Sequence, residues 1–358
     1  MTLWKKKEKS QSIWYMITHA GELNKNEYMK LVRGATWFVG LGFIASFAVF
    51  IVIALIGGIG TVISTILSSN LYLYSLAFVM VFLGYLIRFS KWQYYLKKLK
   101  LKVPWKKNLI VYLSLYSMNI TPGMIGRVLV AYTISKLTDV KTSAVVPIVM
   151  MDIFTDFIGT AVVALLAAIY FHQYVLYVIG IDILLIIPYA FILNDWFYRL
   201  IKRVFKNRRF LEMFTLYGDE YFASQSTLNT PKTYAVSLAA TLPATIFASM
   251  ALYFTLLAIG IVPHLSGTIF IYTSAHIFGM VTAIPGNIGV TDGALVALLG
   301  SAFHMSTAAA SAVTIMTRFA TLWFGIALGG VLLIYTFRYW GQRPRHAESA
   351  SKAVRKSA

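Results

Sequence analysis

The chain of 358 residues has no cysteine and few charged residues. The lack of cysteine excludes disulfides, thiol nucleophiles and cysteine-ligated metals. Only 13% of the residues are charged and 58% are hydrophobic, whereas about a quarter of the residues in soluble domains are charged. Residues 233–291 contain no Lys, Arg, Asp or Glu at all. This composition predicts an all-α, polytopic membrane protein.

Motifs of soluble enzymes are also missing. The sequence has no Walker loop, dinucleotide fingerprint, HExxH or GxSxG motif. The histidines are scattered without the spacing of metal ligands, at His19, His172, His264, His276, His304 and His346. We therefore expect no catalytic residue, cofactor or metal, and only His276 merits mutation.

The net charge of +19 is large enough to suggest a nucleic-acid partner. The basic residues, however, lie in blocks between apolar stretches, where they act as topology signals and contact anionic lipids. Segments 1–33, 88–107, 136–141, 194–232 and 336–358 hold 30 of the 32 Lys and Arg residues. The links 57–70, 171–173 and 260–267 hold no charged residue. We therefore expect no nucleic acid, and place both termini in the cytoplasm.

Six apolar stretches are predicted to cross the plasma membrane: 34–56, 71–87, 143–170, 174–193, 233–259 and 307–335. They belong to one transmembrane domain, 34–335, between a basic N-terminal segment (1–33) and a basic tail (336–358). The segment 194–232 contains a basic amphipathic stretch, which predicts a helix at the membrane surface. The motif GIALG, residues 325–329, indicates close helix packing.

Two further apolar segments, 108–135 and 268–304, are broken by similar motifs, TPGMIG and IPGNIG. The first arm, residues 108–120, spans only about 20 Å as a helix, less than the ~30 Å hydrocarbon core. We therefore predict two re-entrant helical hairpins that enter from opposite sides of the membrane, one in each half of an inverted repeat. Their tips are Pro122, Gly123, Gly126, Pro285, Gly286 and Gly289.

Six charged residues fall within the apolar zones: Arg127, Asp152, Asp156, Asp182, Asp292 and Arg318. Burying charge in a membrane is costly, so these side chains should face the interior and find partners. In one interpretation Arg127 and Arg318 bind an anionic headgroup in a central cavity, balanced by Asp152, Asp156 and Asp292. In the other, the same residues form internal salt bridges that orient the repeats. Asp182 is the weakest candidate.

Polar residues at the two motifs have two candidate roles as well. Asn119, Thr121, Asn287 and Thr291 either hydrogen-bond a ligand or satisfy the broken backbone, and the second role is favoured. The helix that starts after each turn also directs its N-terminal dipole towards the break, which favours an anion.

TPGMIG, the span carrying Asp156, IPGNIGVTDGAL and TRFATLWFG together resemble the lysylphosphatidylglycerol synthase transmembrane-region family, also described as flippase-like domain proteins. The resemblance covers roughly residues 35–335. It implies a membrane domain that moves aminoacylated phosphatidylglycerol between leaflets, while a soluble domain makes the lipid. This chain has only 23 residues after Tyr335, so we expect it to lack the synthase domain.

Two positions depart from the family pattern. Members often carry an acidic residue after the first GxxG and an Arg four residues before the aspartate that aligns with Asp156. Here these positions are Arg127 and Asp152, and one hypothesis is a swapped ion pair. Asp292 stands where a glutamate is usual, whereas Arg318 matches. The lysyl-lipid specificity of the family is therefore not assumed here.

Three functions remain open. The first is a translocator of lipids or lipid-linked glycans, whose partners are membrane lipids with anionic headgroups. The second is a membrane enzyme or accessory subunit in polyprenyl-linked sugar or aminoacyl-lipid synthesis, with Asp152, Asp156 or Asp292 as a candidate base. The third is an anchor for a separate soluble synthase or glycosyltransferase.

Overall fold

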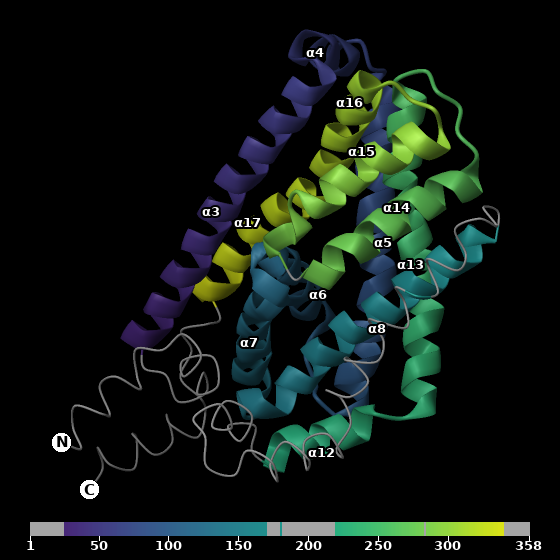
Figure 1. Cartoon of the computed structure of the whole chain (residues 1–358). Coiled ribbons are helices and arrows are strands. Elements are labelled where there is room, and N and C mark those ends of the chain that lie inside the picture. Colours follow the sequence, from purple (N-terminus) through teal and green to yellow (C-terminus); the bar gives the residue numbers. More distant parts are fainter. Residues whose placement is uncertain (1–24, 170–179, 181–218, 283, 340–358) are drawn as a thin grey trace, which may run out of the picture.

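The computed structural model describes residues 25–169, 180, 219–282 and 284–339 of the chain. Within these ranges the protein is helical, without a strand (Figure 1). The first part of the bundle consists of α3 (Lys25–Gly57), α4 (Ile59–Leu67), α5 (Leu71–Lys98) and α8 (Thr142–Ala168). The second consists of α12 (Asp219–Leu228), α13 (Pro231–Ala258), α16 (Thr307–Arg318) and α17 (Phe324–Tyr339), with a π-helical turn, η5 (Phe319–Trp323), joining the last two.

Two helical hairpins complete the bundle. The first hairpin contains α6 (Trp105–Ser114), the short 3-10 helices η1 (Leu115–Ile120) and η2 (Pro122–Arg127), and α7 (Val128–Thr138). The second contains α14 (Leu265–Thr282), the 3-10 turn η4 (Pro285–Asn287) and α15 (Val290–Ala302). In each hairpin the two helices pack against each other, and TPGMIG and IPGNIG form the turns.

The two long helices α5 and α13 pack side by side in opposite directions. At one end the backbone N–H of Asn70 donates to the carbonyl of Ala258 at 2.8 Å. At the other end Lys98 donates to Thr230 at 2.5 Å. Gly84 permits the close approach, since a Cβ there would lie 3.1 Å from the Ala244 carbonyl oxygen.

Capping residues determine where several of these helices begin. The side chain of Asn70 accepts hydrogen bonds from the first amides of α5, and Thr230 does the same for α13, which starts with a proline. Ser306 caps α16. These side chains satisfy amides that have no partner within the helix.

The turns of the two hairpins meet inside the bundle. Both η1 and η2 contact η4. Ile120 of the first turn and Ile288 of the second share a buried apolar cluster with Leu322 and Ile326. In the second motif, the isoleucine that TPGMIG and IPGNIG share is Ile288, which is buried at this junction.

Six helical segments in the described part of the chain are long and apolar enough to cross a membrane. Five agree with the predicted spans. The sixth is α14, which the sequence pattern placed in a hairpin and whose 18 residues extend about 27 Å. The predicted span 174–193, Asp182 and most of the segment 194–232 lie outside the described residues, as do residues 1–24 and 340–358.

The predicted packing motif GIALG lies where α17 crosses the first hairpin. A Cβ at Gly329 would lie 2.5 Å from the backbone nitrogen of Ser117 and 2.9 Å from the carbonyl oxygen of Leu113. A Cβ at Gly325 would lie 2.6 Å from the hydroxyl of Tyr85. Both glycines therefore allow a contact that a larger residue would prevent.

Candidate functional site

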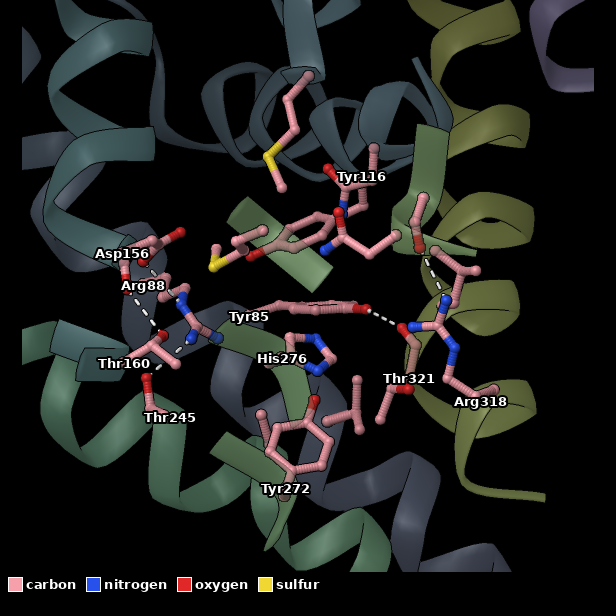
Figure 2. A pocket seen from close by; sticks show the side chains of 18 of the residues that line it. Tyr85, Arg88, Tyr116, Asp156, Thr160, Thr245, Tyr272, His276, Arg318 and Thr321 are labelled. Atoms are coloured by element: carbon pink, nitrogen blue, oxygen red, sulfur yellow. Dashed lines mark hydrogen bonds and ion pairs between the residues drawn. The ribbon is translucent and has the colours of Figure 1, made fainter. Parts of the chain in front are cut away.

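A polar pocket lies where the two turns meet (Figure 2). It encloses about 110 Å³, well below the ~300–1,000 Å³ of a site for a drug-sized ligand, so it has room for one small polar group. Its charged and polar lining comprises Tyr85, Arg88, Tyr116, Asn119, Arg127, Asp156, Thr160, Thr245, Tyr272, His276, Asn287, Arg318 and Thr321. The apolar lining includes Val81, Met124, Ala248, Met280 and Leu322.

Arg318, the last residue of α16, joins that helix to the second turn. Its Nε donates to Asp292 Oδ1 at 2.8 Å, and its Nη2 donates to the carbonyl oxygen of Gly286 at 2.7 Å. The other carboxylate oxygen of Asp292 accepts the backbone N–H of Gly289 at 2.7 Å. Asp292 and Arg318 are buried, so this ion pair holds the IPGNIG turn against α16.

Arg127 follows the first turn directly, as the last residue of η2. Its Nε and Nη2 donate to Asn119 Oδ1 at 3.0 and 2.7 Å. Its Nη1 lies 3.4 Å from Asp152 Oδ2. The proposed ion partners Arg127 and Asp152 are therefore in contact, and Asn119 binds this arginine.

Two basic residues of α5, Arg88 and Lys91, also belong to this charge network. Arg88 donates to Asp156 at 2.9 Å and to Thr245 at 3.1 Å. Lys91 Nζ lies 2.7 Å from Asp156 Oδ1 and 3.2 Å from Asp152 Oδ1, and its side chain is completely buried. We expected both residues in a basic block after the second span, but α5 continues to Lys98 and both side chains bind carboxylates inside the bundle.

Aromatic rings occupy the space between the cationic groups. Figure 2 shows Arg88 and Arg318 on opposite sides of the pocket, with Tyr85 and His276 between them. Tyr85 stacks on Tyr116 with ring centroids 3.7 Å apart, and His276 stacks on Tyr272 at 4.7 Å. The rings therefore form rigid walls of the pocket. Of these four rings, only that of His276 was singled out from the sequence.

The polar residues of the turns have different roles. Thr121 satisfies the backbone, as its Oγ1 donates to the Met118 carbonyl and accepts the Gly126 N–H at 2.9 Å. A Cβ at Gly126 would lie 2.7 Å from Thr121 Cγ2, so the glycine is required for this turn. Asn287 instead lines the pocket. Thr291 is buried and its hydroxyl has no described partner.

Five of the eight predicted binding residues line the pocket: Asn119, Arg127, Asp156, Asn287 and Arg318. The other three do not line it. Asp152 and Asp292 bind the lining residues Arg127 and Arg318, and Thr121 hydrogen-bonds the backbone of the first turn. Among the predicted tip residues that the structure describes in full, Gly286 lines the pocket. No group of three or more His, Asp or Glu in the described ranges is arranged to hold a metal.

The fold and its apolar helices define an integral, multi-pass membrane protein. The sequence profile of the lysylphosphatidylglycerol synthase TM region matches residues 37–329. The chain therefore belongs to the lysylphosphatidylglycerol synthase TM-region family, as its motifs indicated. Among curated proteins, none matches the sequence significantly.

Proposed function

We propose that this protein moves a lipid with an anionic headgroup between the leaflets of the cytoplasmic membrane. The observation that carries the proposal is the pocket at the meeting point of the two turns. Among the described residues, Arg88, Arg127 and Arg318 line it, together with one carboxylate, Asp156. Arginine is well suited to phosphate because its planar group donates two parallel hydrogen bonds.

The repeated element order supports a transport mechanism. Each half has a long helix, a hairpin that turns at PGxIG, and a second long helix, and α5 runs opposite to α13. In our proposal the halves form an inverted repeat, and the hairpins are re-entrant. Inverted repeats whose broken helices meet at the substrate site are an architecture of transporters that work by alternating access.

The small pocket volume fits a mechanism in which only the headgroup enters. A phosphate group would sit between the arginines while the acyl chains remain in the surrounding lipid. Movement of one hairpin relative to the other would then open the pocket to each side in turn.

The distribution of charge gives the orientation that we propose. The segments 97–107, 136–141 and 230–232 lie near one end of the bundle (Figure 1) and contain nine lysines. The links 58–70, 259–264 and 303–306 lie near the other end and have no Lys, Arg, Asp or Glu. The positive-inside rule places the lysine-rich end in the cytoplasm. Near this end Lys141 forms an ion pair with Glu220, which lowers the pKa of that carboxyl group.

The test is a leaflet-resolved assay in liposomes that contain the purified protein and a phosphatidylglycerol with a fluorescent tail. Chemical quenching from outside reports how fast the inner-leaflet lipid emerges. Arg88→Gln is expected to slow emergence at least tenfold without lowering the folded yield, whereas Lys100→Gln, an exposed control, leaves the rate unchanged. Equal rates in protein-containing and empty liposomes, or product formation from lipid precursors in detergent, would reject translocation as the function.

A further inference from the structure

The carboxylates around the pocket are already bound to cations or amides. Asp292 holds Arg318 and a backbone N–H, and Asp152 lies between Lys91 and Arg127. Asp156, the one carboxylate among the described residues that line the pocket, accepts from both Arg88 and Lys91. An ammonium group that entered the pocket would therefore meet no carboxylate without a cation beside it in the described part of the chain.

The same network carries an excess of positive charge. Its cations are Arg88, Lys91, Arg127 and Arg318, and its anions are Asp152, Asp156 and Asp292. The formal charge of these seven described groups is +1. Because unbalanced charge is costly in a low-dielectric interior, a ligand with one negative charge neutralises the network. A cationic ligand increases the imbalance.

Two polar side chains without a formal charge partner, His276 and Asn287, also line the pocket. The Nδ1 atom of His276 is buried without a hydrogen-bond partner, and stacking on Tyr272 fixes its ring. Asn287 lies in the second turn, where its side chain lines the pocket and its backbone is left-handed (φ 54°). A buried polar atom without a partner costs about 1–3 kcal/mol, so a ligand that supplies a partner binds more tightly.

A hydroxyl group fits these two side chains in any of their states. Neutral histidine has one nitrogen that donates and one that accepts, and the amide of asparagine does both. A hydroxyl also donates and accepts, and so pairs with each of them. An apolar group at this place would leave the buried Nδ1 atom of His276 without a partner.

On the basis of the proposed translocation, we infer that the pocket selects a phosphodiester lipid whose headgroup bears uncharged hydroxyls, and rejects a headgroup that bears an ammonium group. The phosphate lies among the arginines, and the hydroxyls bind His276 and Asn287. Phosphatidylglycerol has this chemistry. Its lysyl ester adds positive charge to a network that already has an excess.

The test compares three lipids with the same fluorescent tail in the leaflet-resolved assay. Phosphatidylglycerol has a phosphate and hydroxyls, phosphatidylmethanol has the same charge without hydroxyls, and lysylphosphatidylglycerol adds ammonium groups. The wild-type protein is expected to move phosphatidylglycerol at least tenfold faster than the lysyl ester and about threefold to tenfold faster than phosphatidylmethanol, the range that one neutral hydrogen bond supplies.

Two variants locate the selectivity. His276→Phe keeps an aromatic ring against Tyr272, and Asn287→Gly keeps a residue that tolerates a positive φ, while both remove the polar group. Each is expected to reduce the preference for phosphatidylglycerol over phosphatidylmethanol at least twofold without changing the rejection of the lysyl ester. The control is Lys100→Gln, which changes an exposed residue in the link between α5 and α6, outside the pocket lining, and should leave all three rates unchanged.

The outcomes separate this inference from the translocation on which it depends. If no lipid moves faster than in empty liposomes, the proposed function fails. If lipids move but the lysyl ester is fastest, or if both variants keep the full preference for phosphatidylglycerol, the selectivity inferred here is wrong. A last outcome concerns the source of the phosphate group. If glycerol phosphate entrapped in the liposomes is released as fast as the lipid crosses the bilayer, the pocket recognises this headgroup chemistry, but its ligand is the soluble phosphate ester and the inference of a lipid ligand is wrong.

Discussion

Met124 and Asn287 occupy the same position in the two PGxIG turns, and both have a left-handed backbone, with φ of 57° and 54°. Both residues line the pocket. A left-handed conformation costs most residues about 1–2 kcal/mol, and asparagine tolerates it better than methionine. Backbone strain of this kind collects at functional sites, and here it recurs at equivalent positions of two separate turns.

These two positions should prefer glycine to alanine. Because alanine resists a positive φ and glycine does not, the Gly variants of Met124 and Asn287 are expected to be more stable than the Ala variants by about 1 kcal/mol. Thermal unfolding in detergent measures the difference. At Ala294, inside α15, the order should reverse, with Ala294→Gly less stable than the wild type. An alanine preference at both turns would contradict the left-handed backbone.

The ion pair between Arg318 and Asp292 should be structural as well as functional. Arg318→Met leaves the carboxylate of Asp292 buried without its cation, at an expected cost of about 3–5 kcal/mol. In the double variant Arg318→Met/Asp292→Leu no buried charge is left unpaired, so most of the folded yield should return. Lipid transport should not return, because the pocket has lost an arginine. Size-exclusion profiles and the liposome assay measure the two effects separately, and a double variant that folds no better than the single one would contradict this pairing.

The swapped-pair hypothesis for Arg127 and Asp152 has to include Lys91. Its Nζ lies 3.2 Å from Asp152 Oδ1, so an arginine at 152 would face another cation. Arg127→Asp combined with Asp152→Arg is therefore expected to recover little of the folded yield lost in each single reversal. Adding Lys91→Met should recover more, since the new arginine lies four residues from Asp156 and can pair with it. Equal yields from the double and triple variants would show that Lys91 does not interfere.

Neighbouring glycines in α17 provide a matched comparison of packing. Gly329→Ala places a methyl group against the backbone of Ser117, whereas a Cβ at Gly330 has no neighbour within 4 Å. Gly329→Ala should therefore lower the unfolding temperature by several degrees. Gly330→Ala should maintain or raise it, because alanine favours a helix by about 1 kcal/mol over glycine. If both variants unfold at the same temperature, α17 does not pack closely on the first hairpin.

The sequence was sufficient to locate the turns and most of their charges. TPGMIG and IPGNIG identified two chain segments that meet in space, and a rule about the cost of buried charge was enough to select Arg127, Asp156 and Arg318. The pairing of Arg318 with Asp292 could not be derived in this way, since it depends on a contact between α15 and α16.

Arg88 and Lys91 were missed because hydropathy ended the second span at residue 87. Lys91 is followed directly by the aromatic-rich stretch WQYY. The spacing of three residues between Arg88 and Lys91 places them on one helical face. That face is buried against α8 and α13, where the charges of Asp152 and Asp156 compensate them. The tyrosines at 85, 116 and 272 were missed for another reason: aromatic residues are so common in this chain that composition alone does not distinguish a pocket wall from an interfacial anchor.

The π-helical turn at Phe319–Trp323 begins directly after Arg318. A π turn is an α-helix with one inserted residue, and such insertions are frequent at functional sites. The π turn separates α16 from α17. Arg318 at the end of α16 holds the second turn, whereas Gly325 and Gly329 of α17 pack on the first hairpin. A change in the register of this inserted residue would rotate Arg318 while the glycine contact stays in place, so that one hairpin can move without displacing the other.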